Sequence, residues 1–86
     1  MPQVMNDSDA RSAIMREFYK HYLENGLHII VNGDYVAKQL GLDAAQARRC
    51  FDYLSEKGYI RPMTLGGGYS PTVALVDEIE PLSQRQ

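Results

Sequence analysis

Two histidines and one cysteine are the side chains of this 86-residue chain that most readily bind a soft metal ion or act as nucleophiles. They are His21, His28 and Cys50, and no CxxC spacing, HxxxH spacing or second cysteine accompanies them. Cys50 falls on the apolar positions of a helical pattern, where a buried thiol behaves as a small hydrophobic group. We therefore predict no metal, no cofactor and a structural role for Cys50.

Acidic residues and glycines offer two other kinds of chemistry. Asp77, Glu78 and Glu80 lie in a polar stretch without a pocket pattern, and no Ser, His and Asp stand at a recognisable catalytic spacing. Gly66-Gly67-Gly68 has the composition of a phosphate-binding loop, but no Lys-Ser or Lys-Thr pair follows it. The sequence predicts that the protein is not an enzyme and that the glycines form a hairpin tip.

Basic side chains gather in the middle of the chain. The whole sequence has 9 basic and 11 acidic residues and a pI near 5.5, which counts against a strong nucleic-acid binder. Residues 32–61, in contrast, are net positive and include the adjacent Arg48 and Arg49. Guanidinium groups pair with guanine edges or phosphate oxygens, although adjacent basic residues on a helix more commonly form a solvated face. Both interpretations stay open from these residues alone.

A four-residue spacing of apolar side chains predicts the first helix, from about residue 9 to residue 25. Its stripe consists of Ala10, Ile14, Phe18 and Tyr22. Asp7, Ser8 or Asp9 can cap its start, and Gly26 ends it. A short apolar run with β-branched residues, Leu27–Val31, follows and predicts one small strand.

Two further helices are predicted on either side of a tight turn. Asn32 and Asp43 are suitable N-caps for helices over residues 34–40 and 43–57, and Gly41 supplies a left-handed end to the first of them. The apolar spacing of the second of these helices places its core face at Ala47, Cys50, Phe51 and Leu54.

The last third of the chain predicts a hairpin. Residues 59–65 and 69–79 are rich in β-branched and aromatic side chains, and they flank the three glycines. Pro62 and Pro71 lack an amide donor, so we expect both at strand ends, edges or bulges.

The length and hydropathy of the chain limit the number of domains and exclude a membrane-spanning helix. The chain is long enough for one small domain, which we place at residues 8–79, between a flexible lead-in (1–7) and a flexible tail (80–86). The longest apolar runs, Ile29–Val31 and Val73–Val76, are far too short to cross a bilayer. Because no signal-peptide pattern is present either, we expect a cytoplasmic protein without membrane contact.

The middle of the chain holds an ungapped motif, Val36-Ala37-Lys38-Gln39-Leu40-Gly41-Leu42-Asp43, followed by Phe51, Leu54 and Gly58-Tyr59-Ile60. This motif resembles the winged helix-turn-helix family of bacterial and archaeal transcription regulators. In that family a small residue (Ala37) lets two helices approach, a glycine (Gly41) makes the turn and an apolar residue (Leu42) fills the junction. With the first helix and the hairpin, the resemblance covers most of the chain.

The resemblance implies an α+β fold: a winged helix of three helices with a small antiparallel sheet. It also implies that a recognition helix at about residues 43–57 enters the major groove of DNA, while a wing hairpin at about residues 59–76 touches the neighbouring backbone or minor groove. The implied contact residues are Lys38, Ala44, Ala45, Gln46, Arg48, Arg49, Arg61 and Gly67.

Within this set, the side chains suit different contacts. Gln46 can pair bidentately with adenine, although a capping box with Asp43 alone would explain a glutamine at this position. Arg48 and Arg49 suit guanine edges or phosphate oxygens. Asp52 lies one helical turn after Arg48 and can pair with it, which would partly neutralise this face.

Two functions of different classes follow from the resemblance. The first is a small sequence-specific DNA-binding transcription regulator, a homodimer through helix one and the C-terminal strand, with no small-molecule ligand. The second is a protein-protein interaction module or assembly adaptor without DNA binding, which the acidic pI and the bare glycine wing tip favour. A positive strip joining Lys38, Arg48, Arg49 and Arg61 would favour DNA, whereas acid-interrupted charge beside an apolar patch would favour a protein partner.

Overall fold

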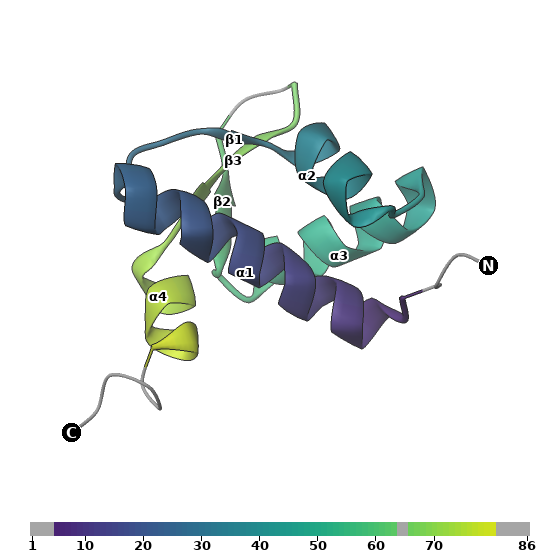
Figure 1. Ribbon diagram of the computed structural model, residues 1–86, viewed down its shortest axis with the longest axis horizontal. Coiled ribbons are helices and arrows are strands. Elements are labelled where there is room, and N and C mark those ends of the chain that lie inside the picture. Colours follow the sequence, from purple (N-terminus) through teal and green to yellow (C-terminus); the bar gives the residue numbers. More distant parts are fainter. Residues whose placement is uncertain (1–4, 64–65, 81–86) are drawn as a thin grey trace.

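The computed structural model describes residues 5–63 and 66–80, and within them the chain forms four helices and a three-stranded antiparallel sheet. The predicted α+β class is therefore confirmed, with one helix more than predicted. In chain order the elements are α1 (Asp7–Asn25), β1 (Val31–Asn32), α2 (Gly33–Leu40), α3 (Ala44–Glu56), β2 (Ile60–Pro62), β3 (Gly68–Pro71) and α4 (Val73–Ile79). Figure 1 shows α1 crossing the molecule, with α2 and α3 towards one end and α4 at the other.

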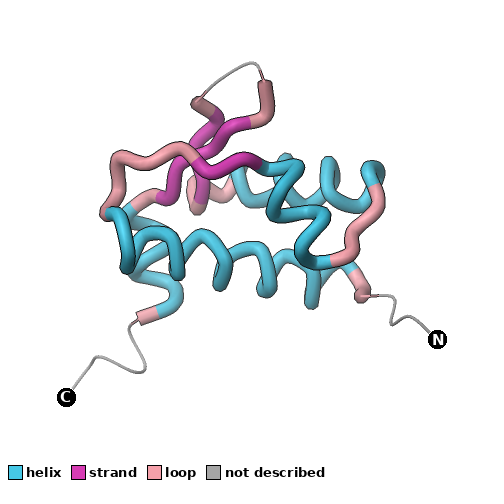
Figure 2. The backbone as a smooth tube through the Cα atoms, turned by 45° about the horizontal axis from the view of Figure 1, so that its top comes forward, coloured by secondary structure: helices cyan, strands magenta, loops and turns pink. Residues whose placement is uncertain are grey.

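β3 is the central strand of the sheet. It pairs antiparallel with β1, where Val31 faces Tyr69, and with β2, where Ile60 faces Pro71. Pro62 is the last residue of β2 and Pro71 the last of β3, so both prolines lie at strand ends, as their missing amide donors predict. Figure 2 shows the chain passing from β1 into α2 without an intervening loop.

The core is built around α1. The predicted stripe is buried at Ala10, Ile14 and Phe18, and the predicted core face of α3 is buried at Ala47, Cys50, Phe51 and Leu54. The ring of Phe18 meets the rings of Phe51 and Tyr69 edge to face, with both centroid distances at 6.4 Å. This aromatic cluster joins α1, α3 and β3 into one core.

Side-chain caps start α2 and α3 as predicted. Asn32 Oδ1 accepts a hydrogen bond from the Tyr35 amide at 3.1 Å, and Asp43 Oδ1 accepts one from the Gln46 amide at 2.8 Å. Gly41 ends α2 with φ +74°, a left-handed conformation that other residues rarely adopt. The short turn between the two helices therefore follows from local side-chain chemistry.

The start of α1 differs from the prediction. Asn6 caps the helix in place of the three predicted candidates Asp7, Ser8 and Asp9, because its Oδ1 accepts a hydrogen bond from the Asp9 amide at 2.7 Å. Asp7 and Asp9 lie in the first helical turn, where the helix dipole favours acidic side chains. Asp7 is thus part of a helix and not of the predicted lead-in, of which residues 1–4 lie outside the described residues.

The sequence predicts that the second strand of the hairpin continues beyond Pro71, and this prediction is wrong. Thr72 Oγ1 caps α4 by accepting a hydrogen bond from the Leu75 amide at 3.3 Å, and residues 73–79 are helical. Leu75 is fully buried, and Tyr19 on α1 donates a hydrogen bond to Glu80 at 2.8 Å. Packing against α1 therefore overrides the β propensity of this valine-rich run.

Two other boundaries shift. The predicted strand at Leu27–Val31 is a turn and a loop whose pairing begins only at Val31, because Gly26 (φ +85°) redirects the chain after α1. The predicted hairpin shortens to β2 and β3, while residues 64–65 of the wing and 81–86 of the tail lie outside the described residues. In the described part of the chain, no helix is long and apolar enough to span a membrane.

Candidate functional site

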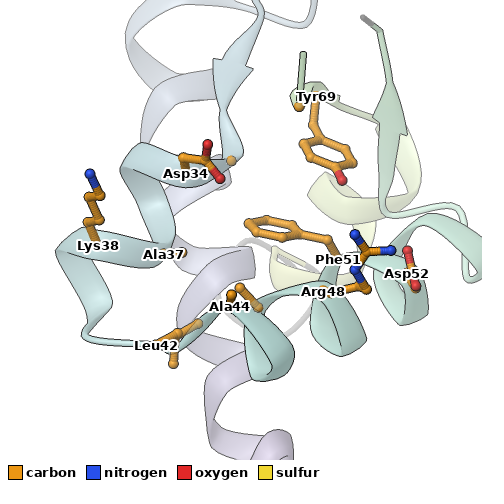
Figure 3. A pocket seen from close by; sticks show the side chains of 12 residues that line it. Asp34, Ala37, Lys38, Leu42, Ala44, Arg48, Phe51, Asp52 and Tyr69 are labelled. Carbon is orange, nitrogen blue, oxygen red and sulfur yellow. The ribbon is translucent and has the colours of Figure 1, made fainter. Parts of the chain in front are cut away.

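A cleft with a volume of about 490 Å³ lies between α2, α3 and the start of β3. We call it the α2–α3 cleft (Figure 3). Its lining residues come from all three elements and from the turn before β3: Gly33, Asp34, Ala37, Lys38, Leu42, Ala44, Ala47, Arg48, Phe51, Asp52, Gly67 and Tyr69.

An aromatic stack forms the back of the cleft. The rings of Phe51 and Tyr69 lie parallel, with centroids 4.9 Å apart and an angle of 13° between their planes. Beside them, the Gly33 amide donates a hydrogen bond to the Gly67 carbonyl at 2.9 Å, which holds the first turn of α2 against the turn before β3. The geometry of the cleft is thus set by packing that joins three elements.

Two cations and two carboxylates line the rim of the cleft. Lys38 and Arg48 are exposed, and so are Asp34 and Asp52. Figure 3 shows Arg48 and Asp52 pointing toward one another on α3, but no ion pair within 4.0 Å or hydrogen bond joins them. The predicted Arg48–Asp52 pair is therefore a proximity of charges and not a closed ion pair.

Tyr69 lies within the electrostatic field of these rim groups. Its burial raises the pKa of the phenol; Asp52 and Asp34 raise it further, while Arg48 acts in the opposite direction. The hydroxyl of the half-buried Tyr69 is therefore un-ionised at neutral pH. The two cations and two carboxylates of the rim cancel, so the rim carries no net charge. Sequence reasoning missed Asp34 and Tyr69, because neither belongs to the predicted recognition helix.

Gln46 and Arg49 face a different part of the molecule, the start of α1. Arg49 donates two hydrogen bonds to the Asp7 carboxylate, from Nε at 2.8 Å and from Nη2 at 3.0 Å. Gln46 Nε2 donates to the Met5 carbonyl at 2.6 Å and to Asp7 Oδ1 at 3.2 Å. The side chain of Gln46 is therefore directed to the segment before α1, and in the described residues no hydrogen bond runs from the Asp43 amide back to Gln46 Oε1, so the second half of the predicted capping box does not form.

The Asp7–Arg49 pair gives a direct spectroscopic prediction. The Arg49 guanidinium, followed by the Gln46 amide, lowers the pKa of Asp7 from 3.8 to about 2. Because the pKa is depressed in the folded state, the stability from this pair is present above pH 3.8 and is lost as the pH falls toward 2. By NMR we expect the Asp7 carboxyl of the Arg49→Gln variant to titrate at a clearly higher pH than the wild-type value of about 2, because the hydrogen bond from Gln46 remains but the larger effect of Arg49 is lost.

Arg16→Gln, which removes an exposed cation elsewhere on α1, is the control and should leave that midpoint at about 2. If the two variants titrate alike, the pair does not form in solution.

The predicted contact residues divide into two groups. Lys38, Ala44, Arg48 and Gly67 line the α2–α3 cleft. Ala45, Gln46, Arg49 and Arg61 do not: Ala45 is exposed beside the cleft, and Arg61 lines a separate cleft between β2 and the start of α4. With Asp34 and Asp52 on the rim and Arg49 paired to Asp7, the described surface carries acid-interrupted charge in place of a continuous positive strip.

Comparison of the chain with models of protein families, with curated proteins and with solved structures finds no match in any of the three.

Proposed function

We propose that the domain is a winged helix that binds double-stranded DNA through the exposed residues of α3 that line the α2–α3 cleft. The observation that carries this proposal is the placement of Ala44 and Arg48, which are exposed on α3 and line the same cleft as Lys38 of α2. Small side chains at the start of a helix allow its backbone to approach base edges closely, and a neighbouring arginine can then read a guanine.

Free cations support the proposal further. Lys38, Arg48 and Arg61 form no hydrogen bond or ion pair with side chains of the described residues. Their long side chains are exposed, so each can reach a phosphate or base without breaking an existing contact. Arg49 differs, because a phosphate would have to displace Asp7 from its guanidinium. The main contact from α3 is therefore assigned to Arg48.

The net charge of −2 sets the expected strength of binding. Non-specific affinity for DNA comes mainly from neutralised phosphates, and this chain has few free cations on the proposed face. We therefore expect weak non-specific binding with a shallow salt dependence. Specific base contacts by α3 would supply most of the selectivity.

The test is fluorescence anisotropy with labelled duplex DNA of random sequence, starting at roughly 50 mM salt, where phosphate attraction is easy to detect. We expect the wild type to bind and Arg48→Ala to bind more weakly, with a slope of log K against log salt that is smaller by about one unit, as the loss of one phosphate contact predicts. Arg16→Ala removes an exposed cation from α1, away from the cleft, and is the matched control.

Two outcomes would reject the proposal. The first is no binding by the wild type at the lowest salt. The second is an equal loss in Arg48→Ala and Arg16→Ala, because the affinity would then reflect total charge and not contact by α3.

A protein-interaction module is the alternative function, and the acid-interrupted rim of the α2–α3 cleft favours it. Several large apolar side chains are also more than half exposed: Leu23, Ile30, Tyr35 and Val73. A second copy of the chain is one such partner, and the proposed homodimer would now use α1 and α4, since the predicted C-terminal strand is helical. If the wild type binds no DNA, sedimentation velocity of the full chain becomes the next measurement.

A further inference from the structure

Asp52 is an acidic side chain for which the fold provides no explanation. It lies in the middle of α3, too far from the N-terminus to interact favourably with the helix dipole. It follows Arg48 by four residues, and an acid placed after its basic partner is the less stabilising order on a helix. Asp34 and Asp43, in contrast, serve the first turn of α2 and the cap of α3.

Asp52 also lies on the proposed DNA-binding face, where its negative charge opposes binding to phosphates. It is exposed, lines the α2–α3 cleft with Arg48 and forms no hydrogen bond or ion pair with the described residues. A carboxylate on this face repels phosphate and weakens all non-specific binding. On a DNA-binding face, a carboxylate that repels phosphate can still contribute by discriminating between bases.

The spacing of the two side chains fits a double-helical target. Residues four apart on an α-helix are separated by about 6 Å along its axis, at about 1.5 Å per residue. Successive base pairs are about 3.4 Å apart, so the two side chains span about two base-pair steps. Figure 3 shows both side chains on the same face of α3.

The two groups select different bases. A guanidinium donates two parallel hydrogen bonds to N7 and O6 of guanine. A carboxylate only accepts, so in the major groove it pairs with the N4 amino group of cytosine and is repelled by the O4 of thymine and the O6 of guanine. Adenine offers an amino group as well, but its N7 acceptor lies beside that group and repels the second carboxylate oxygen.

Resting on the proposed DNA binding, we propose that Arg48 and Asp52 together determine sequence specificity, with Arg48 reading a guanine and Asp52 reading a cytosine within about two base pairs of it. Asp52 lowers the affinity for every other sequence, which is discrimination by repulsion. The preferred target of this chain is therefore a duplex containing G·C pairs at both contacted positions.

The test is selection of preferred sites from randomised duplexes by the full chain, followed by Kd measurements on duplexes that differ at one position. The variant is Asp52→Asn, since an asparagine of the same shape pairs bidentately with N6 and N7 of adenine. We expect one selected position to change from cytosine to adenine, with a shift in the C/A preference of at least about tenfold. The guanine position should not change.

Glu56→Gln is the matched control. Glu56 is the exposed last residue of α3, lies outside the α2–α3 cleft, and its replacement removes the same single charge. We expect this control to select the same site as the wild type.

The other outcomes separate this inference from the proposed function. If Asp52→Asn binds all duplexes more tightly and selects the wild-type site, Asp52 only repels phosphate and the inference is wrong, while DNA binding stands. The same holds if the wild type binds without sequence preference. If the wild type binds no duplex, both the proposed function and this inference are rejected.

Discussion

Replacing Phe18 with alanine is expected to lower the free energy of unfolding by about 3–5 kcal/mol, the usual loss for a buried aromatic ring. Phe18 is fully buried and touches the rings of both Phe51 and Tyr69. Because native domains are stable by only roughly 5–15 kcal/mol, this loss removes a large part of the total stability. The loss would also remove the support behind the aromatic stack of the α2–α3 cleft.

Urea unfolding followed by circular dichroism measures this effect as a lower midpoint with an unchanged slope. Leu23→Ala on the same helix is the control, because its side chain is 64% exposed and its loss should change stability by less than about 0.5 kcal/mol. Similar midpoints for the two variants would place Phe18 outside the core and would contradict the packing described above.

A single methyl group at Gly33 is expected to destabilise the protein by about 1–3 kcal/mol, through overpacking. A Cβ atom at this position would lie 2.9 Å from Cε1 of Tyr69 and 3.1 Å from the Gly67 carbonyl oxygen. The Tyr69 ring cannot move away freely, because it is stacked on Phe51 at 4.9 Å. Gly33→Ala should therefore push β3 and the turn before it away from α2 and disturb the cleft.

A double-mutant cycle isolates the cause. In a Tyr69→Leu background the flat ring is absent, so we expect the penalty of Gly33→Ala, measured by urea unfolding, to become smaller by more than about 0.5 kcal/mol. An equal penalty in both backgrounds would show that the Tyr69 ring is not the obstacle. Near-ultraviolet circular dichroism of the tyrosines would detect altered packing at the cleft, because the chain has no tryptophan.

The elements that could be predicted from the sequence are those fixed by neighbouring residues. Asn32, Gly41 and Asp43 act within one helical turn of themselves, and they set the bounds of α2 and the start of α3. The four-residue stripe on α1 is equally local. The helix α4 was missed because the valines of residues 73–76 favour a strand locally, although Thr72 is a suitable N-cap; burial of Leu75 against the rest of the fold stabilises the helix instead.

The same distinction applies to the candidate site. Lys38, Ala44 and Arg48 share the α2–α3 cleft because their positions follow from the predicted helices. Arg49 and Gln46 were misjudged because their partners lie about forty residues away in the sequence, at the start of α1. Helical periodicity shows that both side chains leave the core face, but it does not show which other segment they meet.

The junction between β1 and α2 has a mechanical consequence. Asn32 is at once the last residue of β1 and the N-cap of α2, and the next residue, Gly33, is hydrogen-bonded to the turn before β3. The sheet and the helix therefore have no hinge between them. A force applied to the sheet would therefore be transmitted directly to α2, and the two elements would tilt together.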